Sequence, residues 1–217
     1  MHIINSKGKK IKITKKDLCN LPSNTIELYC SYNQLTSLPE LPPSLHILHC
    51  FGNQLTSFPE LPPNLEKLYC YNNQLTSLPE LPSSLQKLYC YSNQLTSLPE
   101  LPLNLERLYC FNNQLTSLPE LPSSLQKLYC NSNQLTSLPE LPPNLEKLYC
   151  SGNQLEKIYP DLKKETINLW NRTTLFVQTK WRIKERVKLC PYHKLGRKHM
   201  EEEWEKFKDL LEEKIIN

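Results

Sequence analysis

The chain has 217 residues, a length that fits one or two domains. Its 26 Lys and Arg residues against 22 Asp and Glu residues give a net charge of +4, which is too small to indicate a partner class by itself. Hydrophobic residues make up 39% of the sequence, and no segment approaches the roughly 20 apolar residues that a membrane-spanning helix needs.

Residues 1–20 form a basic N-terminal segment with six Lys and one Asp. The segment lacks the apolar stretch of a signal peptide, so we expect no secretion by that route. The spacing of Lys9, Ile11 and Ile13 predicts a short strand. We expect this segment to cap the open end of the structure that follows, because an uncapped solenoid exposes its core.

Residues 21–155 are a tandem array with a period of 20 residues, about seven units long. One unit reads LPPNLEKLYCYNNQLTSLPE at positions 61–80, and it contains the spacing L-x-x-L-x-C-x-x-N-x-L. A single unit cannot close a core, so neighbouring units must stack into a solenoid with a parallel β-sheet of short strands. Two or more prolines in most units keep the opposite, convex side extended and polyproline-like.

The units alternate between NLE(K/R), which begins at positions 64, 104 and 144, and SLQK, which begins at positions 84 and 124. The units at 81–100 and 121–140 differ at one position only, where Tyr91 stands against Asn131. This alternation indicates duplication of a block of two repeats.

The unit resembles the short leucine-rich repeats of bacterial secreted effectors. Its Cys in the third leucine position and its low Ala usage make it more similar to leucine-rich-repeat arrays encoded by giant DNA viruses of amoebae. The resemblance covers 135 of the 217 residues. It implies a leucine-rich-repeat solenoid. If the protein is viral, it implies a site of action in the host cytoplasm or nucleus.

Two columns of inward residues form the structural ladder that we expect to hold the array together. The cysteine column is expected to consist of small buried hydrophobic side chains: Cys30, Cys50, Cys70, Cys90, Cys110, Cys130 and Cys150. Thiols in a straight row about 4.8 Å apart cannot surround one tetrahedral metal ion, so we expect reduced thiols and an intracellular location. The asparagine column is expected to bond the backbone of the turns: Asn33, Asn53, Asn73, Asn93, Asn113, Asn133 and Asn153.

The outward positions of the strands form the predicted binding surface on the concave face. Its aromatic and basic residues are of the kinds that dominate protein interfaces: Tyr69, Tyr71, Tyr89, Tyr91, Tyr109, Phe111, Tyr129, Lys67, Lys87, Arg107 and Lys127. In another interpretation the rings only stabilise the sheet through cross-strand stacking. The near identity of the repeats favours that second interpretation, since a tuned site would vary more between units.

An acidic row, one Glu per repeat from Glu40 to Glu140, is expected to be a solvated edge, with divalent-cation binding as the alternative.

Residues 156–217 lose the repeat and carry fifteen basic and eleven acidic residues. We expect a helical tail there, clearest over residues 201–216, that caps the last repeat. Alternatives are a partner-binding helix and a basic contact to nucleic acid or membrane. A zinc site at Cys190, His193 and His199 lacks a fourth ligand at standard spacing.

The sequence contains no phosphate-binding loop and no hydrolase or metalloprotease motif, so we expect no enzyme activity and no cofactor. Some similar bacterial effectors carry a large ubiquitin-ligase domain, which about 60 remaining residues cannot supply. We therefore expect a monomeric module that binds a protein partner on its concave face. The alternatives are a scaffold whose basic ends bind nucleic acid or acidic membrane, and a substrate adaptor for a ubiquitin-ligase-type complex.

Overall fold

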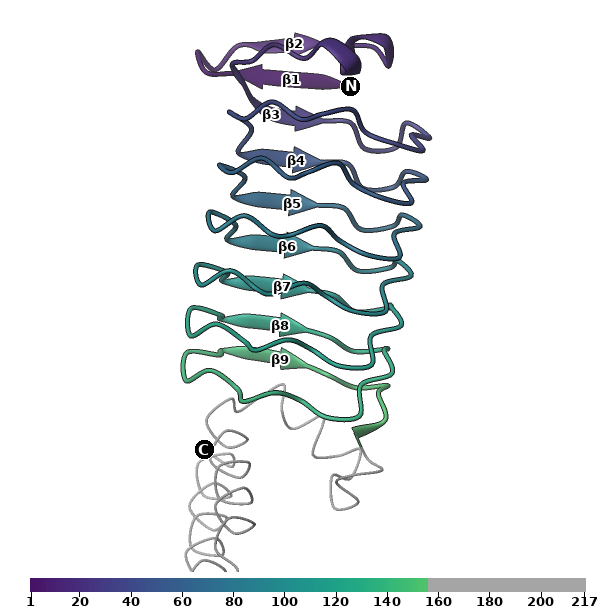
Figure 1. Ribbon diagram of the computed structural model, residues 1–217, viewed down its shortest axis with the longest axis vertical. Coiled ribbons are helices and arrows are strands. Elements are labelled where there is room, and N and C mark those ends of the chain that lie inside the picture. The colour runs from purple at the N-terminus through teal and green to yellow at the C-terminus, as the bar shows by residue number, and fades with distance from the viewer. Residues whose placement is uncertain (156–217) are drawn as a thin grey trace, which may run out of the picture. The chain divides into compact units, whose positions relative to one another are not determined.

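The computed structural model describes residues 1–155, which form one sheet of nine strands in the order β2-β1-β3-β4-β5-β6-β7-β8-β9 (Figure 1). The N-terminal elements are β1 (His2–Asn5), β2 (Lys10–Lys12) and the short 3-10 helix η1 (Lys16–Asn20). The array supplies β3 (Thr25–Tyr29), β4 (Ile47–His49), β5 (Lys67–Tyr69), β6 (Lys87–Tyr89), β7 (Arg107–Tyr109), β8 (Lys127–Tyr129) and β9 (Lys147–Tyr149). The expected helical tail, its alternatives and the Cys190 cluster lie outside the described residues.

The strands β3 to β9 are parallel, and each residue pairs with the residue 20 positions later, as Leu68 pairs with Leu88. This register keeps the leucines of successive units on one face. Leu65, Leu68 and Leu75 have no exposed surface. Between β3 and β9 the linking segments are turns and extended stretches without a helix. The parallel solenoid with an extended opposite side is therefore confirmed.

The N-terminal segment covers the first repeat with a hairpin rather than with the strand expected near Ile11. That strand forms as β2, but β1 lies between it and the array and pairs antiparallel with β3. The reason is burial: Ile3 of β1 pairs with Leu28 and has no exposed surface, whereas Lys10 and Lys12 of β2 are exposed. Charged side chains on an outer strand discourage pairing with another chain.

The position three residues after each strand adopts left-handed backbone geometry in every described unit. It holds Asn72, Ser92 and Asn112 with φ of 53°, 54° and 52°, and glycine at two other units. Such geometry costs little for Gly and Asn, which explains why these residues recur there. In the first unit the position is Tyr32, with 72% of its surface exposed. A Cβ on Gly52 would lie 2.5 Å from the Tyr32 ring, so this glycine leaves room for it.

We predict that Leu88→Ala lowers the free energy of unfolding by about 2–5 kcal/mol. The change leaves a cavity in the core that the surrounding side chains cannot fill. Leu103→Ala is the matched control, since Leu103 is 81% exposed. It should change stability by no more than about 0.5 kcal/mol. Urea unfolding followed by circular dichroism measures both variants. Equal losses would contradict the placement of the core.

Candidate functional site

The asparagine column joins each turn to the preceding repeat. Asn113 donates through Nδ2 to the carbonyls of Cys90 and Cys110, both at 3.1 Å. Its Oδ1 accepts from the backbone N–H of Leu95 at 3.0 Å. Asn73 donates in the same way to the carbonyls of Cys50 and Cys70, and Asn133 donates to those of Cys110 and Cys130. Because each amide from Asn53 onward contacts two adjacent units, the column fixes their spacing and thereby the spacing of the side chains along the array.

The cysteine column lies in the core directly beneath this sheet. The five thiols from Cys50 to Cys130 have no exposed surface, and all seven in the column are free. Burial raises the pKa of Cys90 to about 12 and the pKa of Cys110 well above its ordinary value. The thiols therefore stay protonated near neutral pH, a form that neither attacks electrophiles nor binds metal.

The opposite, solvent-facing side of β3–β9 is named the sheet face here, and it carries two columns of stacked rings. In the first column neighbouring ring centroids lie between 4.2 and 4.8 Å apart. Its members are His2, Tyr29, His49, Tyr69, Tyr89, Tyr109, Tyr129 and Tyr149. Most neighbours are nearly parallel, but Tyr89 and Tyr109 meet at 69°.

The second aromatic column is shorter and more regular. Phe51, Tyr71, Tyr91 and Phe111 follow one another at 4.3, 4.4 and 4.2 Å, each pair within 9° of parallel. Tyr32 adds an edge-on contact to Phe51 at 5.2 Å. In the second column, and in most of the first, the neighbouring rings cover one another's faces. A molecule that approaches the sheet face therefore meets ring edges and hydroxyl groups.

Beside the first aromatic column runs the cation row, defined as Lys67, Lys87, Arg107, Lys127 and Lys147. Strand pairing places these residues directly opposite one another. Hydrogen bonding with the Tyr89 hydroxyl, the largest cause, raises the pKa of the Arg107 guanidinium. Arg107 Nε is buried and has no hydrogen-bond partner within residues 1–155. The guanidinium is thus held against the ring column at the point where the stacking turns edge-on.

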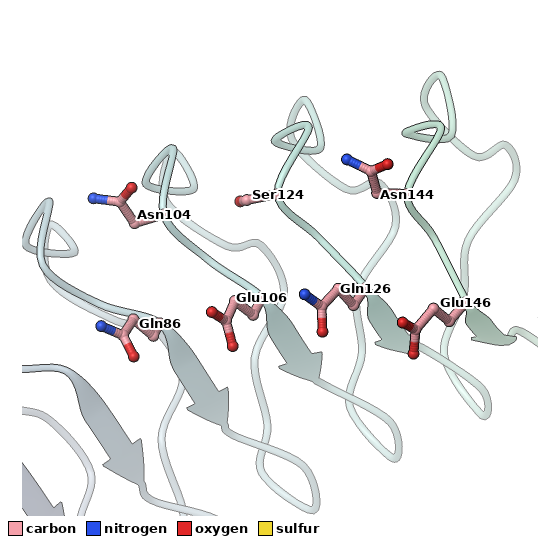
Figure 2. Close-up of a pocket in the computed structure, with 7 residues that line it drawn as sticks. All are labelled: Gln86, Asn104, Glu106, Ser124, Gln126, Asn144 and Glu146. Carbon is pink, nitrogen blue, oxygen red and sulfur yellow. The ribbon is translucent and has the colours of Figure 1, made fainter.

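A shallow groove of about 490 Å3 runs across the beginnings of β6–β9 (Figure 2). One wall is fixed by hydrogen bonds to the preceding turn: Asn104 donates to Ser83 O at 3.0 Å, and Ser124 donates to Leu103 O at 2.7 Å. Figure 2 shows Gln86, Glu106, Gln126 and Glu146 projecting toward the same side where successive strands begin. They belong to the acid–amide row, defined as Glu66, Gln86, Glu106, Gln126 and Glu146.

The structure brings the sequence-predicted binding residues together on the sheet face, in two ring columns and one cation row. The sequence analysis missed His2, which extends the first ring column from β1. It also missed the acid–amide row, although the alternation of NLE and SLQ was its signal. Positions 66 and 67 both face outward because the N–H groups of Glu66 and Lys67 share the His46 carbonyl, at 2.8 and 3.1 Å. Strict alternation of inward and outward side chains along a strand would not predict two successive outward residues.

This arrangement supplies charged, amide and phenolic groups for binding. Within residues 1–155, no three His, Cys, Asp or Glu side chains are placed to hold a metal ion. No helix in that same part of the chain has the length and apolar character needed to cross a bilayer.

Comparison with known proteins identifies the repeats. The family model described as leucine-rich repeats (two copies) matches residues 63–103, 83–123, 103–143 and 123–164. The leucine-rich-repeat domain of a Shigella effector is 39% identical with a TM-score of 0.58, over 64% of this chain and 62% of that one. No curated protein matches the chain.

Two further structures are YopM proteins from Yersinia. YopM from Yersinia enterocolitica is 41% identical with a TM-score of 0.51, over 62% of this chain and 35% of YopM. YopM from Yersinia pestis, a leucine-rich effector, is 38% identical with a TM-score of 0.51, over 58% and 43%. The chain thus covers less than two thirds of each of these structures. It carries leucine-rich repeats similar to those of bacterial effectors, a kind of repeat that generally serves protein interaction.

We predict that Asn113→Ala lowers the free energy of unfolding by about 2 kcal/mol or more. The change leaves the buried Leu95 N–H without its acceptor, a cost of about 1–3 kcal/mol, and removes three further bonds. Asn104→Ala is the control, because its bond to Ser83 O is solvent-exposed. Chemical denaturation should show a loss below about 1 kcal/mol for the control. Two equal losses would mean that the asparagine column does not hold the repeats together.

We also predict that stability falls steeply above pH 9. The pKa of Cys90 is about 12 in the folded protein against 9.0 for a free thiol, so above pH 9 the unfolded chain releases protons that the folded chain retains. Each such thiol then lowers the free energy of unfolding by up to about 1.4 kcal/mol per pH unit. Tyrosines with raised pKa values, such as Tyr71 at about 12, act in the same direction.

The measurement is urea unfolding between pH 7 and 10.5, with Cys90→Ala as the comparison. The variant should be less stable at pH 7 but should lose stability less steeply above pH 9, since one titrating thiol is gone. Parallel slopes for the two proteins would contradict burial of the Cys90 thiol.

Proposed function

We propose that the chain binds a protein partner on the sheet face. The observation that carries this proposal is the preformed surface itself: two stacked ring columns beside a row of five cations, all in register on one sheet. Tyr69, Tyr89 and Tyr109 would be the central anchors, with Tyr71, Tyr91, Phe111 and Tyr129 around them. Lys67, Lys87, Arg107 and Lys127 would steer the partner electrostatically.

Rigidity supports this role. Each ring is held by its neighbours, so little side-chain freedom remains to be lost on binding. The stacking that stabilises the sheet therefore also prepares the surface, and the two interpretations of the tyrosines are compatible. The buried, protonated cysteines fit a reducing compartment. We therefore extend the proposal to a protein that acts inside a cell, which the resemblance to arrays of giant viruses also implies. We propose that it acts as a monomer.

A second candidate is a contact to nucleic acid or acidic membrane through the basic N-terminal segment. Its six lysines are all exposed, on β2, the adjoining loops and the first residue of η1. The sheet face itself suits nucleic acid poorly, because bases stack on open aromatic faces and most of these faces are covered by neighbouring rings. An adaptor for a ubiquitin-ligase-type complex remains a special case of protein binding, with a second partner on residues 156–217.

The test is a crosslinked pull-down from amoeba-type cell lysate at two salt concentrations. One bait carries Lys87→Ser, Arg107→Ser and Lys127→Ser. The matched control carries Lys7→Ser, Lys9→Ser and Lys10→Ser, the same loss of charge on the N-terminal hairpin. We expect the sheet-face variant to lose the wild-type partner by about tenfold or more, because charged interface residues set both rate and specificity. The hairpin variant should retain it.

The opposite result would favour the second candidate. Capture that vanishes for the hairpin variant, or for every bait at high salt, would indicate phosphate contacts rather than a sheet-face interface. A further bait with Tyr69, Tyr89, Tyr109 and Tyr129 changed to Phe keeps the stacked rings and removes only hydroxyl groups. Its capture separates a contact to hydroxyls from a contact to ring edges.

A further inference from the structure

The sheet face carries a charge pattern with two different periods. The cation row has a positive side chain in every repeat from β5 to β9. The acid–amide row beside it alternates, so that a carboxylate recurs only in every second repeat, at Glu66, Glu106 and Glu146. Adjacent parallel strands lie about 4.8 Å apart, so the cations recur at about 4.8 Å and the carboxylates at about 9.6 Å.

An α-helix laid across the strands matches both periods. It rises about 5.4 Å per turn and about 10.5 Å per seven residues. Four turns span about 22 Å, and the five cations span about 19 Å, a difference that long Lys side chains absorb. An extended peptide presents same-side residues about 6.7 Å apart, so four such intervals span about 27 Å and lose register.

The acid–amide row also selects against a uniformly negative partner. Nucleic acid or an anionic membrane would place phosphates opposite Glu106 and Glu146 as well as opposite the cations. Like charges held that close are unfavourable, and such repulsion is a source of specificity. A polypeptide can instead offer acidic and basic side chains in the two rows at once.

We propose, on the premise that the sheet face is the binding site, that its partner presents an acidic α-helix running across β5–β9. The helix places a carboxylate over the cation row once per turn. It places a Lys or Arg over the acid–amide row once per seven residues, facing Glu66, Glu106 and Glu146. The duplicated two-repeat block of the array thus corresponds to one heptad of the partner.

The test uses the full chain and labelled 21-residue helical peptides, with binding followed by fluorescence anisotropy. The first peptide has Glu at the first and fourth positions and Lys at the fifth position of each heptad, with Ala and Gln elsewhere. Its isomer has the same composition, with Glu at the first and third positions and Lys at the sixth, so that the charges surround the helix. A third peptide carries a central Pro that breaks the helix.

The first peptide should bind at least about tenfold more tightly than the isomer and the Pro peptide. Replacing its Lys residues by Gln should weaken binding to the wild-type chain. The same replacement should have no such effect on a chain with Glu66→Gln, Glu106→Gln and Glu146→Gln, whose folding is checked by circular dichroism. Equal binding of the peptides, or no binding of any, would overturn the inference.

The outcome is separable from that of the proposed function. A protein captured through the cation row that contacts it with a strand or loop would overturn the helix and leave the sheet-face site intact. If the Lys87, Arg107 and Lys127 substitutions leave capture of the partner unchanged, the sheet face is not the binding site.

Discussion

The hydrogen bonding of the asparagine column is the interaction on which the rest of the structure depends. Each amide from Asn53 to Asn153 bonds the carbonyls of two successive cysteine positions and an N–H of the preceding unit, as Asn113 does with Cys90, Cys110 and Leu95. Buried turns without such partners would be costly, because backbone groups away from water must be paired. The amide therefore satisfies the turn and sets the step between repeats at the same time.

The arrangement of the sheet face follows from that step. When every unit advances by the same distance, equivalent side chains fall into columns, and rings at successive positions meet at stacking distance. Tyr71 and Tyr91, for example, lie 4.4 Å apart and nearly parallel. The rings thus stabilise the sheet and leave their edges, hydroxyl groups and neighbouring cations for a partner. A solenoid of this kind obtains a rigid, regular outer face as a consequence of its core.

Much of the fold and of the sheet face was predictable from the sequence, because each repeat gives the same indication at the equivalent positions. The period of 20 predicts the parallel sheet, the leucine core and the inward asparagines, since a register shifted by one residue would turn Leu68 and its equivalents to the other face of the sheet. The N-terminal hairpin was less predictable, because Ile3 and Ile11 are both apolar residues in basic surroundings and only tertiary burial distinguishes them. The acid–amide row was missed because Glu66 and Lys67 both face outward, an irregularity that depends on two N–H groups sharing one carbonyl.

The central claim is that a protein partner contacts the sheet face and not the basic N-terminal hairpin. The most direct measurement is crosslinking mass spectrometry of the captured complex, because lysines mark both regions. We expect partner crosslinks at Lys67, Lys87 and Lys127, in the middle of the sheet face. Crosslinks confined to the lysines between positions 7 and 16 would contradict it.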